Sequence, residues 1–241
     1  SASCAFYGVH SICKGTRRKV VVAPLGVRLP EQVRRPLQGM SRRRTLLFVG
    51  RIYPVKGLDL LIAAFDRLKD CNWQLRIVGP DQAHYMRKLL ETALAMGWKT
   101  QVSRNDGVPF ELSKGFKSIS FAGPRYEAQL VAEYEHADAF VLPSYTENFG
   151  SVVVDALAYA LPVLTSTATP WQILKERGCG LEFDLNVEAE HGALARMIGF
   201  SDAERREMGM RGRKLAEEKY QWSAIGRQML AAYEGLLRDK N

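Results

Sequence analysis

Two cations stand close together in a segment that joins an apolar run to a helical pattern. Arg51 and Lys56 lie in the segment 50–57, GRIYPVKG, directly after the apolar run 45–49. Apolar residues then recur at helical spacing from Leu58 onward. We therefore expect both cations at the carboxyl end of a buried strand and beside a helix N-terminus, where an anion binds. A P-loop pattern is absent, which disfavours an NTPase, and a solvated loop is the alternative for the two cations.

Two carboxylates form a second candidate constellation. Glu147 and Asp155 lie eight positions apart in the segment 143–163, PSYTENFGSVVVDALAYALPV. The first is expected in the loop before a helix and the second about two turns along, so both can face one cleft near the helix start. Carboxylates accept hydrogen bonds from hydroxyl groups, and the first backbone N–H groups of the helix can serve a sugar or a phosphate. Helix capping is the alternative for Glu147.

Strand and helix patterns alternate along the chain, which predicts an α/β fold with a doubly wound parallel sheet, right-handed crossovers and ligands at the carboxyl ends of the strands. Residues 97–117 fit no element well and include turn residues at 105–109, so we expect an inserted surface loop there. Strands are expected at 20–23, 45–50, 73–78, 118–122, 139–142, 162–165 and 180–183, and helices at 58–68, 85–96, 130–136, 151–159, 171–176, 186–198, 202–219 and 222–238.

The net charge of +8 is concentrated at the start of the chain. Residues 1–44 hold ten Lys or Arg and one acid, Glu31. No aromatic residues are interleaved for base stacking, which argues against a nucleic-acid partner. The basic residues 14–44 instead fit an interdomain surface, a peripheral contact with a membrane, or a solvated linker.

The cysteines and the hydropathy of the sequence indicate the cellular environment of the protein. The four cysteines are far apart, with no C-x-x-C pair and no histidine cluster around them, so they are expected to be buried apolar residues in a reducing, cytoplasmic environment. Apolar runs reach about six to eight residues, far short of the roughly 20 that a membrane helix needs. The opening residues lack the pattern of a secretory signal. The four histidines are scattered and are expected to be surface or core residues.

The two motifs together resemble the C-terminal domain of family 4 GT-B glycosyltransferases. That family carries a Gly-Arg pair before a Lys-Gly pair, and then P-S-x-x-E-x-F-G with a second acid downstream. Both motifs occur here in that order, about 90 residues apart, and the resemblance extends from about residue 20 to residue 233. Further matching landmarks are Gly79-Pro80, Phe121-Ala122-Gly123 and Ala137-Asp138.

The resemblance implies a Rossmann-like fold and metal-independent transfer from a nucleotide-sugar donor, without a cofactor and with retention of configuration. Arg51 and Lys56 would neutralise the donor diphosphate, and Glu147, as the catalytic residue, would hold a sugar hydroxyl. Asp155 would accept a hydrogen bond from the ribose, and the loop 123–125 would lie against the base. The remaining donor-binding residues implied are Gly50, Gly79, Pro124, Arg125, Asn148, Phe149, Gly150 and Ser151.

Two positions depart from the family pattern. The second acid is Asp155 where the family has Glu, which is one methylene longer, so the expected ribose contact is lost, bridged by water or compensated by a small backbone shift. Ala160 replaces a usual glycine, and therefore requires a negative φ or mild strain.

The family has two Rossmann-like domains, and the resemblance covers one of them. We interpret residues 1–44 as a linker from an N-terminal part, 45–220 as the donor-binding domain, and 221–241 as a helix that crosses toward an N-terminal domain. That domain would bind a glycan or lipid-linked acceptor, so we expect this chain to be inactive alone. A non-catalytic nucleotide-sugar-binding or interaction module is the alternative. An epimerase, a phosphorylase and a nucleic-acid binder are less favoured, and the base, the sugar and the acceptor are left open.

Overall fold

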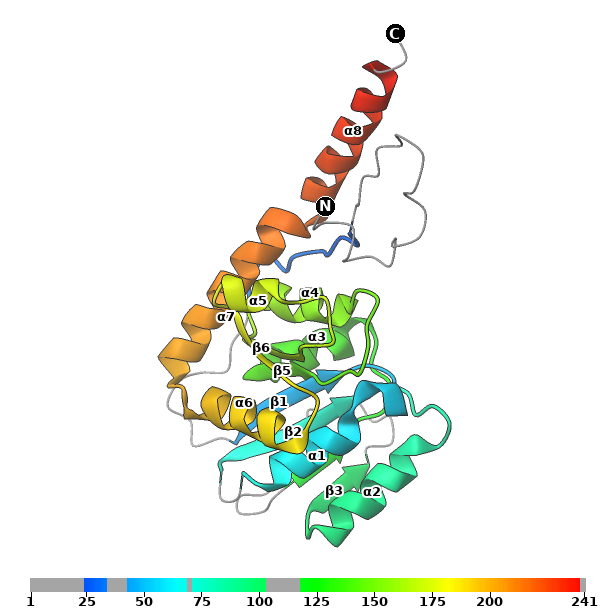
Figure 1. Cartoon of the computed structure of the whole chain (residues 1–241), viewed down its shortest axis with the longest axis vertical. Helices are drawn as coiled ribbons and strands as arrows, with labels where there is room; N and C mark the ends of the chain where they lie inside the picture. Colours follow the sequence, from blue (N-terminus) through cyan, green and yellow to red (C-terminus); the bar gives the residue numbers. More distant parts are fainter. Residues whose placement is uncertain (1–23, 34–42, 69–70, 103–117, 239–241) are drawn as a thin grey trace.

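A seven-stranded, entirely parallel sheet forms the centre of the protein in a computed structural model, which describes residues 24–33, 43–68, 71–102 and 118–238 (Figure 1). The strand order is β3-β4-β2-β1-β5-β6-β7. Every neighbouring pair is parallel, as the alternating pattern predicts. The strands are β1 (Arg44–Val49), β2 (Trp73–Val78), β3 (Lys99–Val102), β4 (Ser118–Phe121), β5 (Ala139–Leu142), β6 (Val163–Ser166) and β7 (Gly180–Phe183).

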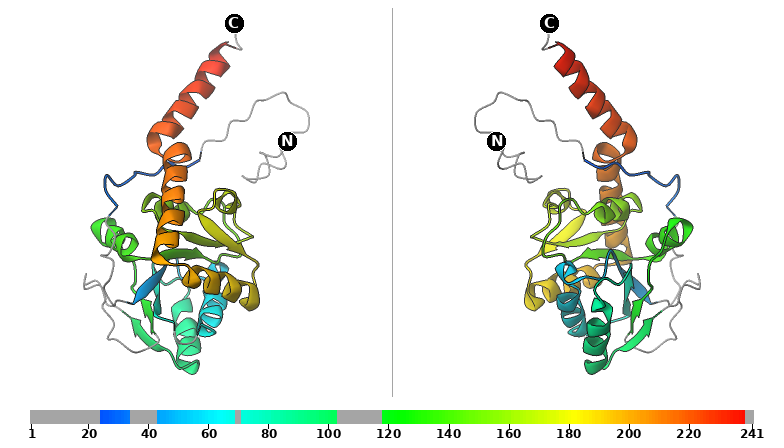
Figure 2. Two further views of the ribbon diagram at one scale, coloured as in Figure 1. Left: turned by 90° about the vertical axis from the view of Figure 1, so that its left-hand side faces the viewer. Right: turned by 90° about the vertical axis from the view of Figure 1, so that its right-hand side faces the viewer.

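Helices cover both faces of the sheet (Figure 2). Right-handed crossovers place α1 and α2 on one face and α3 and α4 on the other. α6 packs against α1, and α7 packs against α4. The helices are η2 (Pro54–Lys56), α1 (Leu58–Asp66), α2 (Tyr85–Ala95), α3 (Glu127–His136), α4 (Ser151–Ala158), α5 (Ile173–Glu176), α6 (Val187–Gly199), α7 (Asp202–Lys219) and α8 (Trp222–Arg238).

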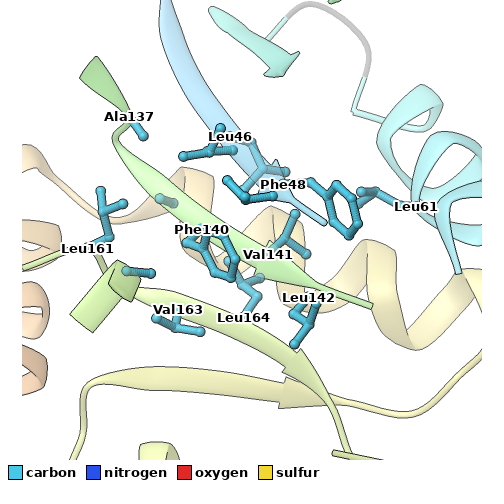
Figure 3. Close-up of a cluster of buried hydrophobic side chains, with 14 of the residues drawn as sticks. Leu46, Phe48, Leu61, Ala137, Phe140, Val141, Leu142, Leu161, Val163 and Leu164 are labelled. Atoms are coloured by element: carbon cyan, nitrogen blue, oxygen red, sulfur yellow. The ribbon is translucent and has the colours of Figure 1, made fainter. Parts of the chain in front are cut away.

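The central strands are apolar on both sides because both faces are covered. Leu46, Leu47 and Phe48 are at most 1% exposed. In Figure 3, Phe48 of β1 lies next to Leu61 of α1, whereas Phe140 of β5 contacts Tyr134 of α3, with ring centroids 6.2 Å apart. Each such side chain contributes roughly 1.5–3 kcal/mol on burial. The sheet therefore has two apolar layers and positions the strand ends rigidly.

The structure corrects the prediction for residues 97–117. β3 occupies Lys99–Val102 and pairs with β4, where we expected only a surface loop. This strand lies at the edge of the sheet, and Lys99, Gln101 and Val102 are exposed. An edge strand needs no apolar run, which is why the sequence pattern missed it. The remainder of the predicted loop, 103–117, and the predicted strand 20–23 lie outside the described residues.

The last helix projects from the body of the protein, beyond α7 (Figure 1). The segment 24–30 runs past the α7–α8 junction, where the Val27 N–H donates to the Tyr220 carbonyl at 2.7 Å. Exposed apolar side chains on α8 are Trp222, Met229, Leu230 and Tyr233. Within the described part of the chain, no helix has the length and hydropathy needed to cross a membrane.

Ala160 ends α4 in a left-handed conformation, with φ of 52°. Its N–H donates to the Leu157 carbonyl at 2.8 Å, and the Leu161 N–H donates to the Ala156 carbonyl at 2.9 Å, which is a helix C-cap arrangement. α7 holds this turn closely, because a Cβ on Gly209 would lie 1.8 Å from the Ala160 oxygen. Of the two outcomes expected for Ala160, the structure adopts the strained one.

Replacing Ala160 by glycine should stabilise the protein. Removing the Cβ relieves the left-handed strain, and after the larger entropy of glycine in the unfolded chain we expect a gain of about 0.5–1 kcal/mol in the free energy of unfolding. Denaturant titration measures it. Ala158→Gly, at the helical end of α4, is the matched control and should lose about 1 kcal/mol. A similar loss in both variants would contradict strain at position 160.

Candidate functional site

Backbone contacts bring the ends of β1, β2 and β4 together. The Gly50 N–H donates to the Val78 carbonyl at 2.9 Å, and the Gly79 N–H donates to the Gly123 carbonyl at 2.9 Å. Gly79 has φ of 144°, and a Cβ there would lie 1.9 Å from the Gly50 oxygen. Only glycine fits at this approach. The predicted residues Gly50 and Gly79, and the loop that begins Gly123-Pro124, therefore meet at the carboxyl edge of the sheet.

A second close approach joins the cation segment to the carboxylate segment. Gly57 adopts a left-handed conformation with φ of 67°, and a Cβ there would lie 2.1 Å from the Pro143 oxygen. The Tyr145 N–H donates to the Val55 carbonyl at 2.8 Å. These contacts fix the end of β1 against the end of β5.

Lys56 and Glu147 form an ion pair at this junction. The Lys56 Nζ lies 2.5 Å from the Glu147 Oε1, and the two side chains are 13% and 12% exposed. The Ser144 hydroxyl donates to the same carboxylate oxygen at 2.7 Å, and the Ser166 hydroxyl donates to the Ser144 carbonyl at 2.5 Å. The predicted cation and the predicted catalytic carboxylate thus meet although they are 91 positions apart. The roles of the two serines were not predicted, although Ser144 lies within the quoted motif.

Arg51 has different surroundings. It is exposed, and its Nη1 donates to the Gln82 Oε1 at 3.2 Å, in the loop after β2. The loops of β1 and β2 are also joined by the Ile52 N–H, which donates to the Pro80 carbonyl at 2.9 Å. Lys56 is therefore held by a carboxylate, whereas Arg51 lies at the solvent-facing side of the edge.

The N-terminus of α4 follows Glu147 directly. Gly150 is the left-handed N-cap, with φ of 74°, and no side chain in the part of the chain that the structure describes caps the helix. The N–H groups at the start of the helix have no acceptor within it, so they can bind an anion or a hydroxyl group. The predicted residues Asn148, Phe149, Gly150 and Ser151 form this turn.

An aromatic cluster supports the turn from behind. The Trp171 Nε1–H donates to the Phe149 carbonyl at 2.6 Å, and the two rings lie 5.4 Å apart. Tyr220 completes the cluster, with its ring 6.0 Å from Phe149 and 5.5 Å from Trp171. Trp171 is 1% exposed, so it is a packing residue that also fixes the loop.

Asp155 lies one turn further into α4, facing α3. Its burial raises its pKa to about 6. Its charge acts on Tyr134 of α3 and on Tyr159, whose rings stack 5.3 Å apart. Asp155 therefore lies on the side of α4 that faces Tyr134 of α3, on the same helix as the open N–H groups.

Arg125 is buried in an ion-pair network. The residue is 6% exposed, and its Nε lies 3.5 Å from the Glu133 Oε1. Arg76 of β2 donates to both oxygens of Glu133, at 2.9 and 2.6 Å. The guanidinium of Arg125 thus holds the β4–α3 loop to α3 and lies inside the protein. A base lying against this loop would meet its backbone and Pro124.

With the geometry in place, the chain can be compared with known proteins. A family model described as glycosyl transferases group 1 matches residues 43–198. A D-inositol 3-phosphate glycosyltransferase of Corynebacterium glutamicum (strain R) is 30% identical over 233 residues, which is 91% of this chain and 50% of that protein. The chain thus spans about half the length of this curated relative.

Solved structures share the fold. Sucrose-phosphate synthase (tll1590) from Thermosynechococcus elongatus superposes with a TM-score of 0.70 at 24% identity, over 90% of this chain and 52% of that one. Anabaena Alr3699/HepE, solved with UDP and glucose, gives a TM-score of 0.64 at 18% identity, over 81% and 49% of the two chains. These likenesses confirm the predicted Rossmann-like α/β fold.

Replacing Trp171 by phenylalanine should loosen the turn at the start of α4. The variant keeps the ring packing but leaves the Phe149 carbonyl without its donor, which costs about 1–3 kcal/mol. We expect faster amide hydrogen exchange at residues 148–152. Trp98→Phe is the matched control, because it removes the 2.8 Å bond from the Trp98 Nε1–H to Asp66, at the end of α1 that is remote from the site. Equal exchange at 148–152 in both variants would rule out this role for Trp171.

Proposed function

The chain belongs to the glycosyl transferases group 1 family, and from this premise we propose that it forms the donor-binding half of a retaining, metal-independent glycosyltransferase. The observation that carries the proposal is the Lys56–Glu147 ion pair beside the open N-terminus of α4. At one sheet edge, the cation matches the diphosphate of a nucleotide sugar, and the carboxylate and free backbone N–H groups match the hydroxyl groups of its sugar.

Positive charge at this edge would stabilise the leaving group. When a donor binds, Lys56 exchanges its ion-pair partner, from the Glu147 carboxylate to the diphosphate. The carboxylate is then free to accept a hydrogen bond from a sugar hydroxyl. Arg51, exposed at the neighbouring loop, adds a second cation. Negative charge develops on the diphosphate as the bond to the sugar breaks, so both cations act where the charge forms. We assign this role to the two side chains without a metal ion.

Asp155 and the β4–α3 loop would hold the nucleoside. An ionised Asp155 accepts a hydrogen bond from the ribose, and the loop 123–125 lies along the base through its backbone. The solved complex of Anabaena Alr3699/HepE with UDP and glucose supports a nucleoside diphosphate as the shared part of the donor.

The acceptor would bind to a second domain. We propose that residues 1–44 link to that domain, that 45–220 bind the donor, and that the helix within 221–241 crosses toward it. The length of the curated relative supports this, as does α8, which projects from the body with exposed apolar side chains. A glycan or a lipid-linked acceptor, a cytoplasmic location and a peripheral membrane contact through residues 14–44 belong to the same proposal. The chain alone then binds donor without transferring sugar.

Calorimetric titration with UDP, GDP and ADP tests the donor site. One nucleotide should bind, and Arg51→Ala combined with Lys56→Ala should weaken its binding by about 100-fold or more, because two charge-assisted contacts are lost. The matched control removes the same charge far from the edge, with Arg196→Ala and Arg206→Ala near the α6–α7 connection. Unchanged nucleotide binding in the Arg51→Ala, Lys56→Ala variant would refute the site. In a longer form of the protein that has activity, Glu147→Ala should abolish that activity, and unchanged activity would favour the non-catalytic module.

Donor binding should strengthen as pH rises from 5 to 7. Burial raises the pKa of Asp155 to about 6, so the acceptor form of the carboxylate becomes populated over this range. Asp155→Asn should lose this dependence, and the affinities of the two proteins should diverge by about tenfold between pH 5 and pH 7. Titration of the ligand phosphate affects both proteins equally. Parallel pH profiles would show that Asp155 does not bind the ribose as a carboxylate.

A further inference from the structure

Glu190, in the first turns of α6, is a carboxyl group sealed inside the protein. The residue is 0% exposed, and neither of its oxygens has a hydrogen-bond partner in the described part of the chain. An ionised carboxylate in such a place is strongly disfavoured, whereas a neutral acid is tolerated. Burial, with the nearby charge of Asp59, raises the pKa of Glu190 to about 8. The amphipathic pattern of α6 did not single this residue out.

The location of Glu190 connects it to the proposed donor site. α6 packs against α1, the helix that begins directly after Lys56-Gly57. Val163 of β6 pairs with Phe140, whose ring contacts Tyr134 of α3, so the side chain of Val163 points to the face that α3 covers. Side chains alternate along a strand, so Ser166, three positions later, points to the opposite face, which α1 covers. From that face the Ser166 hydroxyl holds the Ser144 carbonyl, and Ser144 holds Glu147.

The titratable side chains that act on Glu190 or on its neighbour Asp59 are a carboxylate and two tyrosines. Asp59 of α1 has one buried oxygen, Oδ1, that has no hydrogen-bond partner among the described residues, and Tyr85 of α2 forms a hydrogen bond with Asp59. The charge of Glu190 acts on Tyr145, which directly precedes Thr146 and Glu147. β6 and β7 contribute only uncharged side chains to this face, namely Leu164, Ser166, Leu181 and Phe183. On α6 itself, Glu188 pairs with Arg67, the residue that caps the end of α1, and His191 is the adjacent titratable group.

We propose that Glu190 is a positioning residue for the donor site: as an uncharged acid it keeps α1 and α6 packed beneath the turn from Ser144 to Glu147, and its ionisation weakens donor binding. This inference rests on the donor site proposed above. Ionisation places a second negative charge beside Asp59, close to where the diphosphate binds, and the buried charge draws water between the two helices. Both effects shift the start of α1 and the Tyr145 turn, because the Tyr145 N–H donates to the Val55 carbonyl of η2, which directly precedes α1.

Nucleotide affinity measured from pH 7 to pH 9.5 tests the role. The probe is whichever of UDP, GDP and ADP binds at pH 7. Wild-type affinity should fall by about tenfold between pH 7 and pH 9, because at pH 9 about one Glu190 in ten is still protonated. Glu190→Gln stays uncharged and should keep its pH 7 affinity. The matched control is Glu182→Gln on β7, another carboxyl group whose pKa is raised by burial, and it should follow the wild-type profile.

Equilibrium unfolding provides a second readout. The pKa of Glu190 is higher in the folded than in the unfolded chain, so its contribution to stability is full below the unfolded value of 4.5 and is lost as pH rises to about 8. Relative to Glu190→Gln, the wild-type unfolding constant should rise by up to tenfold per pH unit in this window and then level off. Glu190→Leu replaces Glu190→Gln if the amide fails to fold.

The outcomes separate the two proposals. A nucleotide that binds with the same pH profile in wild type and Glu190→Gln would overturn the role of Glu190 and leave the donor site standing. Absence of nucleotide binding at every pH would overturn the donor site and this role with it. A flat wild-type unfolding profile between pH 5 and pH 8 would show that Glu190 is not held as the neutral acid.

Discussion

The structure depends on the contact of two backbones at Gly57 and Pro143. A Cβ at position 57 would lie 2.1 Å from the Pro143 oxygen, so any other residue would force the ends of β1 and β5 apart. This approach brings the Lys56 ammonium group to the Glu147 carboxylate. It also holds the N-terminal ends of α1 and α4, which lie on opposite faces of the sheet, at the same edge. The apolar layers on both faces of the sheet then keep the strand ends from shifting.

Much of this arrangement could be predicted from the sequence. Apolar runs and helical spacing located six of the seven strands and the α-helices, because strands buried on both faces and helices with one buried face leave clear patterns. β3 was missed because its residues face solvent at the sheet edge. The two motifs located Lys56 and Glu147, and their meeting follows from parallel strands that end at one edge.

Side-chain direction could not be predicted in the same way. From the sequence, the side chain of Arg125 could face solvent or the protein interior. The positions of Glu133 and Arg76 determine that it is buried. Glu190 looks in the sequence like the other charged residues of α6, which face solvent. Its inward direction depends on how α6 packs against α1. The left-handed turn at Ala160 likewise reflects the close approach of Gly209, 49 positions away in the chain.

The pairing of Val27 with Gln221 places the two segments that would lead to the proposed second domain next to each other. The chain enters near residue 24 and leaves along α8 at nearly one place, and Gly26 lies so close to Trp222 that a Cβ would be 2.4 Å from the indole. A body joined through a single strand can spin freely about that strand. A body joined through both of these segments can bend about the line that connects them but resists twisting, so its motion has one axis.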